Sequence, residues 1–231
     1  MGLKHHPRVV TNGLVYYLDA ANPRCYSGSG LTVNGLIAGL GGTLVGAGFG
    51  FTNGGYFTFR NNTDKLNIGN PPILQGLQLN FTLSCWFNQI ANNQYSTLYA
   101  DYSTDNSHKL VSLLRVDSGT LRYYTSNSSG TWQAVSPASI TNGLWYFVSV
   151  TVSGTLSSPT TSIFLNGTTY NNSLSALSST PDITATHSIG GNVYINEGFN
   201  GNISQLSIYN RALTAQEVLQ NYNSTKKRFG L

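Results

Sequence analysis

The chain has 231 residues, of which 9% are charged, and it contains 25 glycines and 14 tyrosines. This composition is typical of many short strands joined by tight turns, and the length fits one large all-β domain. The net charge of +4 comes from the ends of the chain, because five of the twelve basic residues lie there and the remaining seven face eight acidic residues. We therefore expect no nucleic-acid partner, since such a surface needs a basic stripe on the domain itself.

The sequence shows no segment that would direct the chain into a membrane. The first 13 residues lack the apolar run of a signal peptide, and no stretch approaches the ~20 apolar residues of a membrane span. We expect synthesis in a host cytoplasm without membrane insertion. Cys25 lies in a turn-like segment and Cys85 on the apolar side of a strand, so reduced thiols are favoured over the alternative of a disulfide.

The first third of the chain predicts strands separated by turns. Residues 14–20 form an apolar run that suits a strand with neighbours on both faces. The glycine-punctuated residues 26–50 predict a long ordered loop with one short strand near 43–45. Residues 56–60 alternate with their phenylalanines inward, and residues 81–90 form the most regular strand of the sequence.

The remainder predicts further short strands at the spacing of a β-sandwich. A hairpin is indicated where Asn166-Gly167 separates two strand patterns, because this pair favours a type I′ turn. The other strand candidates are residues 96–102, 109–117, 120–126, 131–136, 145–152, 187–195 and 203–209.

One helix is predicted near the C-terminus. Thr214 and Glu217 have the spacing of a capping box, in which each side chain bonds a backbone amide of the other residue. Leu213 and Val218 are spaced as the hydrophobic staple outside it. The helix should therefore begin at Ala215.

The order of motifs is distinctive, namely GLVYYLDAANPRCYSGSG, GGYFTF, FTLSCWF, GLWYFVSVTV with IFLNG, SIGG, and FNGNISQLSIYNRALTAQEVLQNY. It resembles the laminin-G-like domains of the concanavalin A-like lectin/glucanase superfamily over nearly the whole chain. The resemblance implies an all-β fold, a two-sheet antiparallel jelly-roll sandwich with one short C-terminal helix. The opening and the NYNSTKKRFGL ending further resemble stand-alone or terminal domains in structural proteins of tailed bacteriophages, especially marine ones such as cyanophages.

The chain departs from the family pattern where some relatives bind calcium. Ser204 and Gln205 stand where family members often have Asp-Glu, and Arg60 and Asn61 stand where they often have Asp-Gly. The resemblance therefore gives calcium only weak support, and we expect no cofactor.

Enzymes that share this fold resemble laminarinases, which carry a Glu-x-Asp-x-x-Glu pattern on one strand. This chain has two glutamates: Glu217 is explained by capping, and Glu197 is a lone candidate in a loop. We interpret Asp101 and Asp105 as hydrogen-bond acceptors beside a tight turn. We interpret His187, like the other histidines, as an ordinary surface residue. We expect no enzyme, and a glycoside hydrolase is the third alternative.

Carbohydrate binding is the favoured chemistry. A shallow sugar site needs an aromatic face for stacking and amide or carboxylate groups for hydroxyls. Two loop sets offer this combination, although aromatic residues of a sandwich also serve structural roles. The candidate glycan-binding residues are Tyr102, Asp105, Asn106, Tyr124, Asn127 and Trp132.

These inferences lead to a basic N-terminal arm (1–10), a sandwich (11–223) and a basic C-terminal tail (224–231). Our leading hypothesis is a non-enzymatic virion protein on the particle surface, a capsid decoration or capsid-fibre protein that adheres to glycans. The alternative is a carbohydrate-binding tail-fibre or adhesin domain. The partners would be other virion proteins and cell-surface or environmental glycans, with a homo-oligomer left open. Both ends would anchor the protein, through Lys4, Arg8, Lys226, Lys227, Arg228 and the apolar Phe229. Deletion of residues 224–231 should reduce incorporation into particles and leave the sandwich folded.

Overall fold

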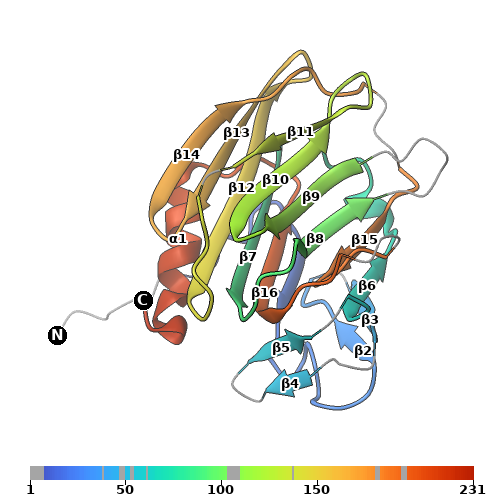
Figure 1. The fold of residues 1–231 in the computed structure, drawn as a ribbon, viewed down its shortest axis with the longest axis vertical. Coiled ribbons are helices and arrows are strands. Elements are labelled where there is room, and N and C mark those ends of the chain that lie inside the picture. Colours follow the sequence, from blue (N-terminus) through green and yellow to red (C-terminus); the bar gives the residue numbers. More distant parts are fainter. Residues whose placement is uncertain are drawn as a thin grey trace.

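Two antiparallel β-sheets pack face to face, and one helix lies outside the first of them (Figure 1). The computed structural model describes residues 8–37, 39–46, 50–52, 55–60, 62–102, 110–136, 138–179, 183–193 and 197–231. The described helices are α1 (Ala215–Thr225) and the 3-10 turns η1 (Pro72–Leu74) and η2 (Lys226–Phe229). No helix within these ranges has the length and apolar character that a membrane crossing would require.

Sheet A has the strand order β14-β13-β12-β7-β16-β5-β4, and β1 pairs with β16 beside this path. Because its neighbours are distant in sequence, the sheet is assembled from both halves of the chain. Its strands are β1 (Leu14–Asp19), β4 (Gly50–Thr52), β5 (Tyr56–Phe59), β7 (Phe81–Gln89), β12 (Trp145–Thr155), β13 (Ser158–Leu165), β14 (Thr168–Ser173) and β16 (Gly201–Tyr209).

Sheet B has the strand order β11-β10-β9-β8-β15-β6-β3-β2 and lies in front of sheet A in Figure 1. Together the sheets form the antiparallel sandwich that the sequence predicts. The strands of sheet B are β2 (Thr32–Asn34), β3 (Gly41–Val45), β6 (Lys65–Gly69), β8 (Tyr95–Tyr102), β9 (Leu110–Asp117), β10 (Thr120–Ser126), β11 (Trp132–Val135) and β15 (Thr186–Ile189).

Strand β7 is buried on both faces because it lies between the core and helix α1. Leu83 and Cys85 point into the main core, whereas Trp86 points outward into a second cluster beneath α1. Val218 and Tyr222 of α1 complete this second cluster. The helix therefore closes much of the outer face of sheet A.

Helix α1 begins at Ala215, and its first turn carries the capping box that the sequence predicts. The Glu217 amide donates to Thr214 Oγ1 at 3.2 Å, and the Thr214 amide donates to Glu217 Oε2 at 2.9 Å. Arg211 adds an ion pair to Glu217 at 2.6 Å. Together with burial of Val218, these contacts fix the start of the helix against the sandwich.

The turn between β13 and β14 also follows the prediction. Asn166 and Gly167 both have positive φ, at 44° and 110°, and Leu165 pairs directly with Thr168. A two-residue loop of this kind matches the right-handed twist of the flanking strands.

Two expectations about local structure were incomplete or wrong. The segment 26–50 contains parts of three short strands, β2, β3 and β4, instead of one. His187 is fully buried, because β15 is an interior strand between β8 and β6, and its ring accepts or donates a 2.8 Å hydrogen bond with the Tyr99 hydroxyl. Both cysteines are buried free thiols.

Candidate functional site

The outer face of sheet B carries three aromatic side chains from neighbouring strands. Alternation along the strands separates them from the core, because Leu114 and Tyr123 point inward while Tyr124 points outward. The Trp132 ring lies 6.0 Å from the Tyr102 ring and 6.2 Å from the Tyr124 ring, both in edge-on geometry. We call these three residues the sheet B aromatic cluster.

Trp132 is the most accessible member of the sheet B aromatic cluster. Tyr102 and Tyr124 are only 4% and 9% exposed, whereas Trp132 is half-buried on strand β11 at the edge of the sheet. The two tyrosines therefore support the indole from below and from the side. The surface available for stacking on a ligand is that of Trp132.

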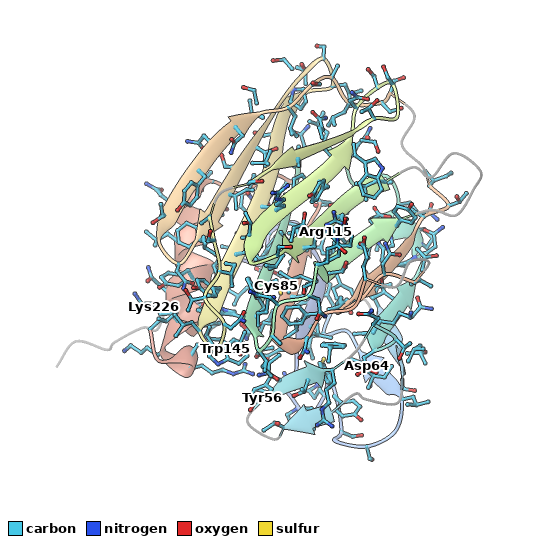
Figure 2. All side chains as sticks on the ribbon, in the orientation of Figure 1. Tyr56, Asp64, Cys85, Arg115, Trp145 and Lys226 are labelled. Carbon is cyan, nitrogen blue, oxygen red and sulfur yellow. The ribbon has the colours of Figure 1, made fainter. Side chains whose placement is uncertain are left out.

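A buried ionic network adjoins this aromatic cluster, centred on Arg115 of β9 (Figure 2). Its Nη1 donates to both carboxylate oxygens of Glu197, at 2.9 and 3.0 Å, and its Nε lies 2.6 Å from Asp117 Oδ1. The guanidinium is held between the rings of Tyr95 and Tyr124, whose centroids lie 4.4 and 4.5 Å away. This cation is therefore paired with two carboxylates and packed against two aromatic rings.

The network positions Tyr124 and the chain around Glu197. The Tyr124 hydroxyl donates a short hydrogen bond to Asp117, and Arg122 lies 3.7 Å from the same carboxylate. Burial raises the pKa of Glu197 above its usual range, and the Arg115 charge opposes this shift. Glu197 is thus held as a structural carboxylate beneath the ligand-accessible surface.

A family model described as the Concanavalin A-like lectin/glucanases superfamily matches residues 50–219. The chain belongs to this superfamily. The matched segment includes β8, β9, β10, β11 and β15, so this laminin-G-like domain contains the sheet B aromatic cluster and the Arg115 network.

Solved structures of similar fold include carbohydrate enzymes and toxin domains. Trypanosoma rangeli sialidase in complex with sialic acid shares 16% identity and a TM-score of 0.72, covering 95% of this chain and 34% of its own. The receptor binding domain of botulinum neurotoxin C/D mosaic serotype shares 13% identity and a TM-score of 0.65, covering 93% and 51%. The botulinum neurotoxin serotype D binding domain shares 14% identity and a TM-score of 0.64, covering 93% and 52%.

The chain therefore spans about a third to a half of the length of these proteins. At such identities the likeness shows the fold alone. No curated protein matches the sequence at a significant level.

Of the six residues predicted for glycan binding, three come together in this laminin-G-like domain, as the sheet B aromatic cluster. Asp105 and Asn106 lie outside the described residues. Asn127 serves the turn between β10 and β11, because its Oδ1 accepts from the amides of Ser129 and Thr131 at 3.0 and 2.9 Å. Sequence reasoning missed Arg115, whose only signal is a charge inside an otherwise apolar strand pattern.

The C-terminal residues are not a free tail, which corrects the expected boundary at residue 223. Helix α1 runs to Thr225, and the Phe229 ring stacks on Trp86 at 4.1 Å and packs in a tilted geometry against Trp145 at 4.7 Å. Arg228 Nη1 donates to Asp19 at 2.7 Å. Phe229 and Arg228 are thus used within the domain, and removal of residues 224–231 would also remove part of its packing.

The other predicted anchoring residues differ in accessibility. Lys227 is exposed, and Lys226 lies 5.1 Å above the Tyr222 ring at the lower end of α1 (Figure 2). Arg8 is exposed, and its carbonyl accepts from Gln220. Lys4 lies outside the described residues.

The residues at the family calcium position do not fit a divalent cation. Ser204 Oγ already accepts from Arg228 Nη2 at 2.7 Å, and Gln205 Nε2 donates to Asp19 at 2.7 Å. A guanidinium therefore supplies the positive charge that a metal would bring to Asp19. The described residues contain no group of three His, Cys, Asp or Glu side chains suited to a metal ion.

Proposed function

We propose that this protein is a non-enzymatic structural protein on the surface of a bacteriophage particle, and that it binds glycans through the outer face of sheet B. The observation that carries the glycan-binding part is the half-buried Trp132 indole supported by two buried tyrosines. An aromatic ring fixed in this way stacks on a sugar ring at little cost in side-chain entropy.

Ion pairing argues against glycoside hydrolysis. A retaining glycosidase needs two carboxyl groups about 5 Å apart, one of them able to donate a proton. Glu197 is tied to Arg115, and Glu217 is tied to Arg211 and to its own helix cap. The Arg211 hydrogen bonds lower the pKa of Glu217 to about 2, which leaves no proton to donate near neutral pH.

The virion part of the proposal is supported by the resemblance of the opening and closing segments to phage structural domains. A capsid decoration or capsid-fibre protein would need a contact with the acidic surface of a shell. Lys226 and Lys227 are the basic residues of the C-terminus that remain outside the Arg228 ion pair. A tail-fibre adhesin is the second candidate, favoured by the same aromatic surface.

Glycan binding is tested on an array of host and environmental polysaccharides, with and without calcium. We expect binding by the wild type that is independent of calcium and lost in Trp132→Ala, because the stacking surface is removed. Leu219→Ala is the matched control, since it removes an exposed apolar side chain of α1 on the other side of the sandwich. Absence of binding, or equal binding by Trp132→Ala, would contradict the proposal.

The virion role is tested by locating the protein in a map of the phage particle and by competition during assembly. The double variant Lys226→Ala/Lys227→Ala keeps Arg228 and Phe229, so the domain should remain folded. We expect it to enter particles less efficiently than the wild type. The exposed Arg24→Ala is the control, and equal incorporation of all three proteins would reject anchoring through these lysines.

A further inference from the structure

A groove runs along the outer face of sheet A, where helix α1 leaves β13 and β14 uncovered. Its volume is about 310 Å³, at the lower end of the range for small-molecule sites. One wall is apolar and comes from Leu213 and Val218 at the start of α1, and Phe164 forms part of the floor. Strands β12 to β14 supply the polar side. We call this the α1 groove.

The polar side of the α1 groove is a regular array of neutral groups. Thr151, Ser162 and Asn171 are paired directly across three neighbouring strands, so their side chains point to the same face about 4.8 Å apart. Thr151 Oγ1 lies 3.2 Å from Thr82 Oγ1, which holds it in place. Ser162 Oγ donates to Asn171 Oδ1 at 2.7 Å.

This hydrogen bonding leaves groups directed to a ligand. Asn171 is exposed, and its Nδ2 has no partner among the residues that the structure describes, while Ser162 Oγ retains acceptor capacity. A donor and an acceptor at neighbouring positions match vicinal hydroxyls of one sugar ring. Phe164, Leu213 and Val218 are largely buried and add a small apolar area beside these groups, which an apolar edge of the same ring can contact.

The chemistry of the α1 groove excludes an acidic ligand. No charged side chain lines it. At the start of α1 the Glu217 amide already donates to Thr214 Oγ1, and the Glu217 carboxylate is neutralised by Arg211. The lining therefore offers no counter-charge to an acidic ligand, and the suitable ligand is neutral.

We propose that the α1 groove is a second binding site, which takes a neutral sugar residue of a polysaccharide. It lies on the opposite side of the sandwich from the sheet B aromatic cluster and shares no residue with it. One copy of the protein can then bind two glycan chains at once. Simultaneous binding would raise the avidity of a particle that displays many copies.

The test is NMR titration of the 15N-labelled full chain with neutral hexasaccharides of glucose, galactose and mannose. At least one should shift the backbone amides of Ser162 and Asn171 at about 10 mM sugar, as expected for a shallow site. Asn171→Lys fills the groove and should weaken these shifts at least about tenfold. Ser173→Lys is the matched control, because Ser173 is the next residue on the same face of β14 and lies outside the groove.

The two sites are distinguished by Trp132→Ala. If the groove shifts persist in Trp132→Ala and Ser173→Lys and are lost in Asn171→Lys, the second site is supported whatever the outcome at sheet B. If no hexasaccharide shifts Ser162 and Asn171, or if Ser173→Lys loses the shifts equally, the inference is overturned. If the Ser162 and Asn171 shifts are themselves lost in Trp132→Ala, they report binding at sheet B, which overturns the α1 groove and leaves the proposed function standing.

Discussion

Substitution of Arg115 by alanine tests whether the buried ionic network stabilises the proposed glycan-binding face. The wild-type guanidinium is the shared partner of Asp117 and Glu197, and its side chain is only 7% exposed. Arg115→Ala leaves the Glu197 carboxylate buried without its counter-ion, and it leaves Asp117 with only the more distant Arg122. It also removes the group between the rings of Tyr95 and Tyr124.

The expected loss of stability is large because the desolvation of the carboxylates is no longer compensated. Removing one partner of a buried ion pair costs about 3–5 kcal/mol, which includes the penalty of the charge left behind. The two cation–π contacts involve the same guanidinium as the ion pairs. Their contribution of about 0.5–2 kcal/mol each is therefore not simply added to the cost of breaking the ion pairs. We expect about 4 kcal/mol in total for Arg115→Ala.

Urea denaturation followed by tryptophan fluorescence measures this loss. For a slope of roughly 2–3 kcal/mol/M, the midpoint should fall by about 1.5–2 M. Arg211→Ala is the internal control, because the Arg211–Glu217 pair has similar distances but side chains that are 27% and 28% exposed. Solvent screening should limit its cost to about 1 kcal/mol.

The pH dependence gives a second readout of the same argument. Burial already raises the pKa of Glu197, and loss of Arg115 removes the charge that opposes this shift. When the pKa of a carboxyl is higher in the folded than in the unfolded protein, the free energy of unfolding rises as pH falls through the folded pKa. The reason is that a neutral carboxyl costs less to bury than a charged one. The difference in free energy of unfolding between the wild type and Arg115→Ala should therefore become smaller as the pH is lowered. A cost below about 1 kcal/mol at pH 7, equal to that of Arg211→Ala, would refute the reasoning.

Two further substitutions test the buried contacts outside this network. Phe229→Ala should destabilise the domain by about 2 kcal/mol and alter tryptophan fluorescence, because it removes the ring that packs against Trp86 and Trp145; unchanged fluorescence would reject the packing of the C-terminus. Burial lowers the pKa of His187 from 6.5 to about 4, so the folded state resists protonation and about 3 kcal/mol of stability should be lost as pH falls from 6.5 to 4. His187→Gln should reduce the dependence of the free energy of unfolding on pH between 6.5 and 4. If that dependence is unchanged, the loss of stability in acid comes from other groups.

The sequence predicts correctly those elements that depend on residues close together along the chain. The capping box at Thr214 and Glu217 and the Asn166-Gly167 turn each involve side chains within a few residues, so spacing alone identifies them. The alternation of residues 81–90 likewise predicted which side chains of β7 face the core. The alternation does not predict that the opposite face of β7 is also buried, because that burial depends on where helix α1 packs.

Contacts between distant segments could not be predicted in this way. Phe229 was interpreted as part of a free tail because its partners Trp86 and Trp145 are far away in sequence, and only the closed sandwich brings them together. Arg115 and Glu197 are likewise 82 residues apart, so the sequence shows Glu197 as a lone loop residue and gives no sign that Arg115 is its partner. The resemblance to a family supplied the sheet architecture but not these pairings.

The scarcity of charge in this chain has a consequence for both proposed glycan sites. Burying a carboxylate is tolerable when a cation lies beside it, and Glu197 and Glu217 are each paired with an arginine. Such pairing neutralises both acids, so the proposed sites would contact ligands through indole, hydroxyl and amide groups. Binding through neutral groups depends little on ionic strength, whereas anchoring through Lys226 and Lys227 is screened by salt. The salt dependence of glycan binding and of particle incorporation should therefore differ, which separates the two functions in one protein.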